Sequence, residues 1–247
     1  MHTHGELRIE PSQEVLSATR EWLGTIRAAL GPEFLAAFLT GSVLTQGFDR
    51  KHSRINVLVV ARALEIPTLD AVHDALTATS EFDPLFLTRT QIVKSLDSFP
   101  IEWMEIKERH LLIEGEEIFD ALEVPARYLR LQCEHELRGR QIQLRQTYLL
   151  SSRAPADLAR VLKSGASSFA TLFRTLLRLR GESPPADNTR VIERVSDLFQ
   201  LDAQGLLGAH LVRYSARDYK PDEMLAIYQR FLTQVERLVI AIDQLPV

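Results

Sequence analysis

Cysteine is almost absent from this chain. Cys133 is the single cysteine among 247 residues. One cysteine cannot form an intrachain disulfide, and it cannot supply a Cys-x-x-Cys metal or redox site. A disulfide-stabilised secreted domain is therefore excluded, and a protein of the reducing cytoplasm is expected.

Long apolar runs are also missing. No run approaches the ~20 apolar residues that a membrane-spanning helix requires. Residues 1–6 contain no apolar segment of the kind that a signal peptide carries, and His2 and His4 are typical of a solvated tail rather than of a metal site. These absences predict a cytoplasmic protein that has no membrane partner.

An excess of positive charge is the third feature that the chain lacks. Its 29 Lys and Arg residues are outnumbered by 33 Asp and Glu residues, which gives a net charge of -4. A general nucleic-acid scaffold favours a strongly basic face, so nucleic acid is disfavoured as a partner, although a local basic patch remains compatible. The composition, 45% hydrophobic and 25% charged, is that of a globular protein with one large domain or two ordinary ones.

The first ~120 residues alternate between helix and strand patterns. Apolar residues recur at helical spacing from about 12 to 30 and stop at Gly31-Pro32. The continuous β-branched run Val57–Val60 is typical of a central strand covered on both faces. The predicted elements are helices over 12–30 and 67–78, and strands over 34–40, 55–60, 85–88 and 100–106. Together they predict a small mixed sheet with helices.

The pattern changes near Pro125, after which every long segment is helical. The segment 157–180 is strongly amphipathic, and Gly181–Pro185 is a clear break. The predicted helices cover 125–151, 157–180, 188–199 and 224–244. The sequence therefore predicts an α+β protein with two domains, an α/β domain over 1–122 and a helical bundle over 123–247.

The segment between the first two predicted strands contains a candidate phosphate site. Gly41 and Ser42 end the first strand, where a Gly-Ser turn brings a backbone N–H and a hydroxyl against phosphate groups. Gly47, in the following loop, is expected to have a positive φ. Arg54 and Asn56 are two residues apart at the start of the second strand, so their side chains are expected on one face.

This order of helix, strand, Gly-Ser turn, polar loop and apolar strand resembles the nucleotidyltransferase superfamily. The superfamily has a polymerase-β-like sheet and includes kanamycin-type, lincosamide-type and minimal nucleotidyltransferases. Several further blocks resemble a bacterial branch in which the Asp-x-Asp motif is degenerate: Leu85–Thr88, Phe99–Glu102, Ile106–His110 and Gln132–Gly139. The resemblance implies an Asp-x-Asp pair on the second strand, a third carboxylate on a neighbouring strand, and Mg²⁺ that carries a nucleoside triphosphate.

The Asp-x-Asp positions are occupied by Arg54 and Asn56, which keep the spacing but not the chemistry. Asn56 offers one neutral oxygen, whereas Arg54 is a permanent cation that has no acceptor. A cation about 4 Å from a divalent ion repels it by several kcal/mol even at an effective dielectric constant near 20. We therefore predict no protein metal ligand, and we expect Mg²⁺ with a nucleoside triphosphate only if the protein is active.

The third carboxylate has two candidates, Glu102 and Glu105, both within the predicted strand 100–106. They are three residues apart, so only one can face the site, and Glu102 is preferred because it lies nearer the middle of the strand. The alternative for both is a solvent-facing position.

Arginines along the helix predicted over 125–151 have two interpretations. In the first, they bind a triphosphate or an acidic partner. In the second, which is favoured, they form a solvated face whose charge is balanced by Glu134 and Glu136. The arginines are Arg127, Arg130, Arg138, Arg140 and Arg145. Arg130 and His135 also have the spacing of a HEPN ribonuclease motif, which on an arginine-rich helix arises easily by chance.

Three functions follow from these residues. The favoured one is a catalytically impaired nucleotidyltransferase-like protein that binds a nucleotide or a protein partner in a regulatory role. The alternative is an active transferase that moves a nucleoside monophosphate from a triphosphate to a small hydroxylated substrate or a protein. The third is an interaction protein whose bundle forms a homodimer face.

Overall fold

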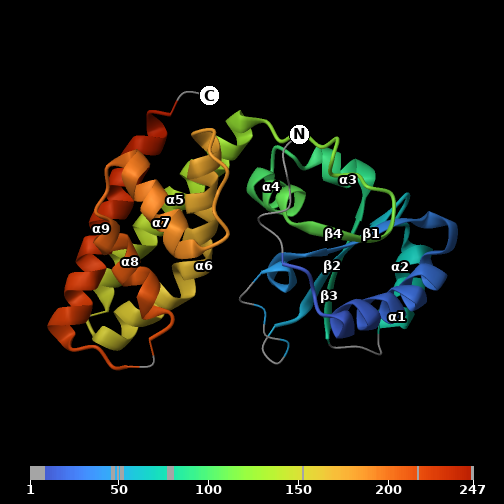
Figure 1. The fold of residues 1–247 in the computed structure, drawn as a ribbon, viewed down its shortest axis with the longest axis horizontal. Coiled ribbons are helices and arrows are strands. Elements are labelled where there is room, and N and C mark those ends of the chain that lie inside the picture. The colour runs from blue at the N-terminus through green and yellow to red at the C-terminus, as the bar shows by residue number, and fades with distance from the viewer. Residues whose placement is uncertain are drawn as a thin grey trace. The chain divides into compact units, whose positions relative to one another are not determined.

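The computed structural model divides into two compact units, Met1–Val124 and Pro125–Val247, which we call the α/β unit and the bundle unit. Figure 1 draws the first in blue to green and the second in yellow-green to red. The residues described are 9–45, 48, 50, 53–76, 81–151, 153–215 and 217–245. Gly47, His2 and His4 lie outside them. Among the described helices, none combines the length and apolar character needed to span a bilayer.

The α/β unit contains a mixed four-stranded sheet in the order β3-β2-β1-β4. β1 runs antiparallel to β2 and β4, whereas β3 pairs with β2 in parallel. The strands are β1 (Phe34–Thr40), β2 (Ile55–Ala61), β3 (Phe82–Thr88) and β4 (His110–Gly115). The predicted mixed sheet and the α+β class are confirmed.

Helices cover both faces of this sheet (Figure 1). One apolar core lies between the sheet and α1 and α2, and the second lies between the sheet and α3 and α4. Alternate residues of β2 enter opposite cores, because side chains along a strand alternate between its faces. The helices are α1 (Gln13–Leu30), α2 (Ile66–Leu76), α3 (Arg89–Lys94) and α4 (Pro100–Glu108), and two short 3-10 turns are η1 (Gly31–Glu33) and η2 (Gly41–Leu44).

The strand predicted over 100–106 is wrong, since this segment forms α4. Pro100 occupies the first turn, where its missing N–H costs no hydrogen bond. Trp103 fixes the helix on the sheet, because its ring is buried and its Nε1 donates to Ser95 Oγ at 2.9 Å. A short apolar run does not distinguish helix from strand by periodicity. The strand that completes the sheet is β4, which the sequence pattern did not reveal.

The bundle unit consists of five described helices. α6 is the most deeply buried, since every residue from Leu172 to Leu177 is buried. Tyr228 of α9 donates its hydroxyl to Leu144 O of α5 at 2.9 Å, and burial raises the pKa of that hydroxyl to about 12. The helices are α5 (Ala126–Leu150), α6 (Pro155–Leu179), α7 (Asn188–Phe199), α8 (Ala203–Val212) and α9 (Pro221–Asp243). The predicted bundle is confirmed, and α8 is an addition to it.

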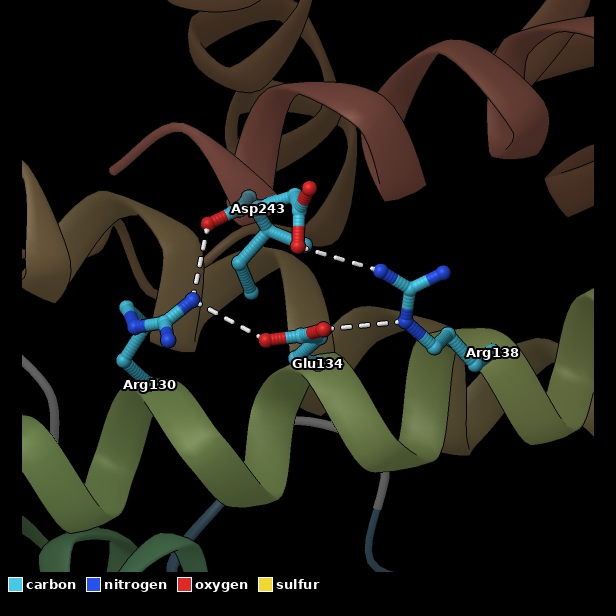
Figure 2. A network of polar contacts seen from close by, with 5 residues as sticks. Arg130, Glu134, Arg138 and Asp243 are labelled. Carbon is cyan, nitrogen blue, oxygen red and sulfur yellow. Dashed lines mark hydrogen bonds and ion pairs between the residues drawn. The ribbon is translucent and has the colours of Figure 1, made fainter.

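A polar network joins α5 to the end of α9, as Figure 2 shows. Glu134 accepts from Arg130 Nη1 and from Arg138 Nε, each at 2.9 Å. Arg130 Nη1 also donates to Ile242 O at 3.2 Å, and Arg138 Nη2 donates to Asp243 Oδ1 at 3.1 Å. These two arginines are therefore engaged within the bundle, which agrees with the interpretation of a balanced helix face.

His210 of α8 gives the bundle unit a predicted sensitivity to acid. Burial lowers its pKa below the ordinary 6.5, and the nearby positive charges of Arg213 and Arg174 lower it further, against an opposing effect of Asp187. Because the unfolded chain binds this proton more readily, the free energy of unfolding falls as the pH drops below about 6.5. We expect His210→Gln to flatten the pH dependence between about pH 7 and 5. Urea unfolding of both proteins across this range measures it, and identical slopes would contradict the expectation.

Candidate functional site

A row of polar side chains crosses all four strands at one end of the sheet. Thr40 of β1 pairs with Asn56 of β2 and with His110 of β4, and Asn56 pairs with Asp83 of β3. Directly paired residues point to the same face of a sheet, with Cβ atoms about 5 Å apart. We call Asp83, Asn56, Thr40 and His110 the polar row.

The polar row lies on the face that α3 and α4 cover. The next row on this face is apolar, because Phe38 pairs with both Leu58 and Leu112, and Leu58 pairs with Leu85. Phe38 and Leu58 are fully buried in the core against α4. The change from apolar to polar side chains therefore occurs at one end of the sheet, where β1 ends and β2 begins.

The Gly-Ser turn lies directly against this row. Gly41 has a φ of +71°, and a Cβ at this position would lie 3.4 Å from Asn56 Nδ2. Glycine is therefore favoured both by the backbone and by the close approach to β2. The turn is closed by Ser42 O, which accepts from Thr45 N at 2.9 Å and from Thr45 Oγ1 at 2.8 Å. The structure thus brings together three predicted site residues, Gly41, Ser42 and Asn56.

Arg54 lies two residues before Asn56, immediately ahead of β2, and its side chain is exposed. Within the part of the chain that the structure describes, no hydrogen bond or ion pair holds this guanidinium. A fixed positive charge is thus presented to solvent beside the Gly-Ser turn. This charge can meet an anionic ligand without first breaking an internal ion pair.

The structure does not place Glu102 or Glu105 on a strand beside Asn56. Both belong to α4, where Glu102 is exposed and Glu105 forms an ion pair with Arg109. The strand position on which their assignment depended is therefore wrong. The carboxylate on the neighbouring strand β3 is that of Asp83, which the sequence pattern did not reveal.

Asp83 was missed because the predicted third strand began at Leu85. Pro84 lacks an N–H group and is unfavourable inside a strand. β3 lies at an edge of the sheet, where a strand tolerates proline, so it begins at Phe82 and includes Asp83. One signal in the sequence could have identified Asp83: it is an acidic residue at the start of the apolar run that forms β3.

His110 ends the row on the other side and is held by several contacts. Its Nδ1 lies 2.9 Å from Ile106 O and 3.1 Å from Lys107 O, so this nitrogen donates to the last turn of α4. Its Nε2 lies 3.1 Å from Glu117 Oε2. The ring also packs edge-on against Phe38, with centroids 5.5 Å apart. His110 therefore connects α4, β4 and the following loop, which favours a positioning role.

These residues do not fit a two-metal centre. Among the described residues, no group of three or more His, Cys, Asp or Glu side chains could hold a metal ion. The polar row offers one carboxylate, Asp83, and one neutral amide, Asn56, beside the cationic Arg54. Mg²⁺ prefers several carboxylate or phosphate oxygens in octahedral geometry, which this set does not supply.

Comparison with known proteins identifies the fold. No family model and no curated protein matches the sequence. Among solved structures, the chain is similar to spectinomycin adenyltransferase AAD(9) from Enterococcus faecialis, whose crystal structure contains ATP and spectinomycin. The TM-score is 0.51 and the sequence identity 12%, and the match covers 89% of this chain and 98% of that chain. At this identity the similarity establishes a nucleotidyltransferase fold.

Proposed function

We propose that this nucleotidyltransferase-fold protein binds a nucleotide through its phosphates without a two-metal centre, and that it acts as a binding or regulatory protein. The observation that carries the proposal is the exposed Arg54 beside the Gly41-Ser42 turn, at a position where the resemblance implies a metal-binding aspartate. We also propose that the chain belongs to a bacterial branch of the superfamily with a degenerate Asp-x-Asp motif.

The chemistry of these groups supports phosphate binding. A guanidinium donates two parallel hydrogen bonds to a phosphate, and its charge offsets part of the charge that Mg²⁺ otherwise balances. Gly41 has no side chain of its own, and this allows the Asn56 amide to approach the turn closely. Asn56 adds an amide N–H donor, because its Nδ2 lies directly against the turn at Gly41.

A second candidate function, an active transferase, is favoured by one observation. Asp83 is directly paired with Asn56, so one carboxylate lies on the strand next to the degenerate motif. A carboxylate there fits the third acidic position that the resemblance implies. In this alternative, Asp83 replaces Glu102 and Glu105 as the expected acidic residue, and the substrate hydroxyl loses its proton to it.

Thermal shift measurements with ATP, GTP, CTP and UTP test the proposal. A ligand that binds only the folded state raises the Tm according to its concentration and Kd. We expect at least one nucleotide to raise the Tm in the presence of EDTA. Arg54→Gln should abolish this shift, whereas Arg20→Gln, an exposed arginine on α1, should preserve it. Stabilisation that strictly requires Mg²⁺ would contradict metal-independent binding.

Release of pyrophosphate from labelled triphosphates separates the two candidates. The binding protein releases none at any metal concentration. Steady release that is lost in Asp83→Asn and retained in Glu102→Gln would instead establish the active transferase.

A further inference from the structure

The bundle unit contains an open pocket of about 1080 Å³ that the proposed nucleotide site does not use. It is lined by the first turns of α6, by the residues that follow α8, and by Met224 in the first turn of α9. Every lining residue belongs to the bundle unit. Its volume lies just above the usual range of small-molecule sites, about 300–1000 Å³.

Cationic side chains dominate the charge of this pocket. Arg160, Lys163, Arg213 and Arg217 line it together with one carboxylate, that of Asp218. The whole protein carries a net negative charge, so four cations around one concavity are not explained by composition. A cleft lined by one sign of charge concentrates ligands of the opposite sign.

Two of these cations already have carboxylate partners. Arg160 pairs with Asp157, and Arg217 pairs with Glu223. The Arg217 guanidinium also lies over the Tyr219 ring, 4.5 Å from its centroid, which fixes the plane of the guanidinium. The side chains of Arg160 and Arg217 are therefore held in place at the pocket, and the carboxylates of Asp157 and Glu223 largely balance their charges.

The other two cations, Lys163 and Arg213, outnumber the Asp218 carboxylate and leave the pocket lining with an excess of positive charge. Among the described residues, neither forms an ion pair with a carboxylate. Arg213 donates to the hydroxyl of Ser167, a neutral partner that leaves its charge uncompensated. Ser167 also lines the pocket, so one hydroxyl lies beside these charges, whereas the Ser164 hydroxyl donates to Val161 O at 3.1 Å.

The start of α6 adds a weaker attraction for anions. Pro155 and Ala156, in the first turn of this 25-residue helix, line the pocket. The first N–H groups of a helix carry a partial positive charge and favour an anion, but Pro155 has no N–H and the Asp157 carboxylate already lies in this turn, so the contribution is small. This contribution acts in the same direction as Lys163 and Arg213.

We infer that this pocket binds a phosphate-bearing small molecule, with Lys163 and Arg213 as its principal phosphate contacts. The Arg213 guanidinium, the Lys163 ammonium and the Ser167 hydroxyl match the oxygens of a phosphate or diphosphate group. A bounded concavity fits a small molecule better than a long polyanion. The site is separate in sequence from the Gly41-Ser42 turn, so it stands whether or not that turn binds a nucleotide.

Isothermal titration with inorganic tripolyphosphate tests this inference. The titration uses the full chain with Arg54→Gln. This substitution removes the proposed nucleotide contact, so that the measured binding is that of the bundle pocket. The test variant adds Lys163→Gln and Arg213→Gln. The matched control adds Arg190→Gln and Arg237→Gln, two exposed arginines on α7 and α9 that lie outside the pocket lining and produce the same change in net charge.

We expect the test variant to bind tripolyphosphate at least about tenfold more weakly, because it loses two charge-assisted contacts. The control should bind as the parent does, and equal unfolding midpoints of all three proteins establish that they are folded. Equal weakening in both variants, or no binding to the parent at millimolar ligand, would overturn the inference. A single-stranded oligonucleotide that binds more tightly than tripolyphosphate, and loses this binding in the test variant, would overturn it in favour of nucleic acid.

Discussion

Restoring carboxylates with the double substitution Arg54→Asp and Asn56→Asp is expected to make nucleotide binding dependent on Mg²⁺. In the proposed binding mode of the wild-type protein, the Arg54 guanidinium contacts the phosphates directly. In the variant, two aspartates at this end of the sheet repel the phosphates unless a divalent ion bridges them. Asp83 is directly paired with position 56 and supplies the third carboxylate on the neighbouring strand. Three acidic side chains then lie where the wild-type protein has one.

The expected change is large because attraction becomes repulsion. Losing a charge-assisted contact costs about 1.5–3 kcal/mol, and the new negative charges add to this, so metal-free affinity should fall by about 100-fold or more. Titration of a nucleotide with EDTA or with Mg²⁺ measures both states. Asn56→Asp alone, which retains Arg54, is the control and should remain partly metal-independent. Equal binding of the double variant in EDTA and in Mg²⁺ would contradict the proposed role of Arg54.

Gly115→Ala is expected to destabilise the α/β unit strongly. Gly115 ends β4 with a φ of +97°, a conformation that L side chains rarely adopt. A Cβ there would lie 2.6 Å from Ala36 Cα and still closer to the Leu35 carbonyl oxygen. Both neighbours are backbone atoms of β1, so neither can rotate away, and β4 must separate from β1. We expect the free energy of unfolding to fall by about 3 kcal/mol or more.

Gly181→Ala is the matched control for this prediction. Gly181 follows α6 with a φ of +77°, and a Cβ there meets no atom within 4 Å. The control therefore carries the backbone strain without the collision and should cost about 1–2 kcal/mol. Urea unfolding of the two variants measures the difference. Similar losses in both would show that backbone strain, rather than contact between β4 and β1, decides the effect.

Local patterns in the sequence predicted the elements whose signals are local. α1 has a helical apolar repeat, with Ser12 Oγ accepting from Val15 N at its start, and the predicted strand 34–40 is β1. The amphipathic pattern of 157–180 likewise predicted α6. In each case the residues that determine the element are neighbours in the chain.

The sequence pattern failed where a distant partner decides the conformation. The segment beginning at Pro100 is helical, and its Trp103 is buried in the core under the sheet together with Phe38 and Leu58, which are distant in the chain. β4 is a strand because it pairs with β1, which lies far from it in the chain. Apolar runs this short fit either conformation until the surface against which they pack is known.

The sequence alone was enough to predict the two-part organisation of helix and strand patterns, the Gly-Ser turn, and the Arg54 and Asn56 spacing on which the proposed loss of two aspartates depends. The tertiary structure was needed to show that Asp83 and His110 lie in one row with Asn56, and that Lys163 and Arg213 line the same pocket. The reason is that strand register and helix packing are non-local. They bring together side chains whose separation in the chain leaves no periodic signal.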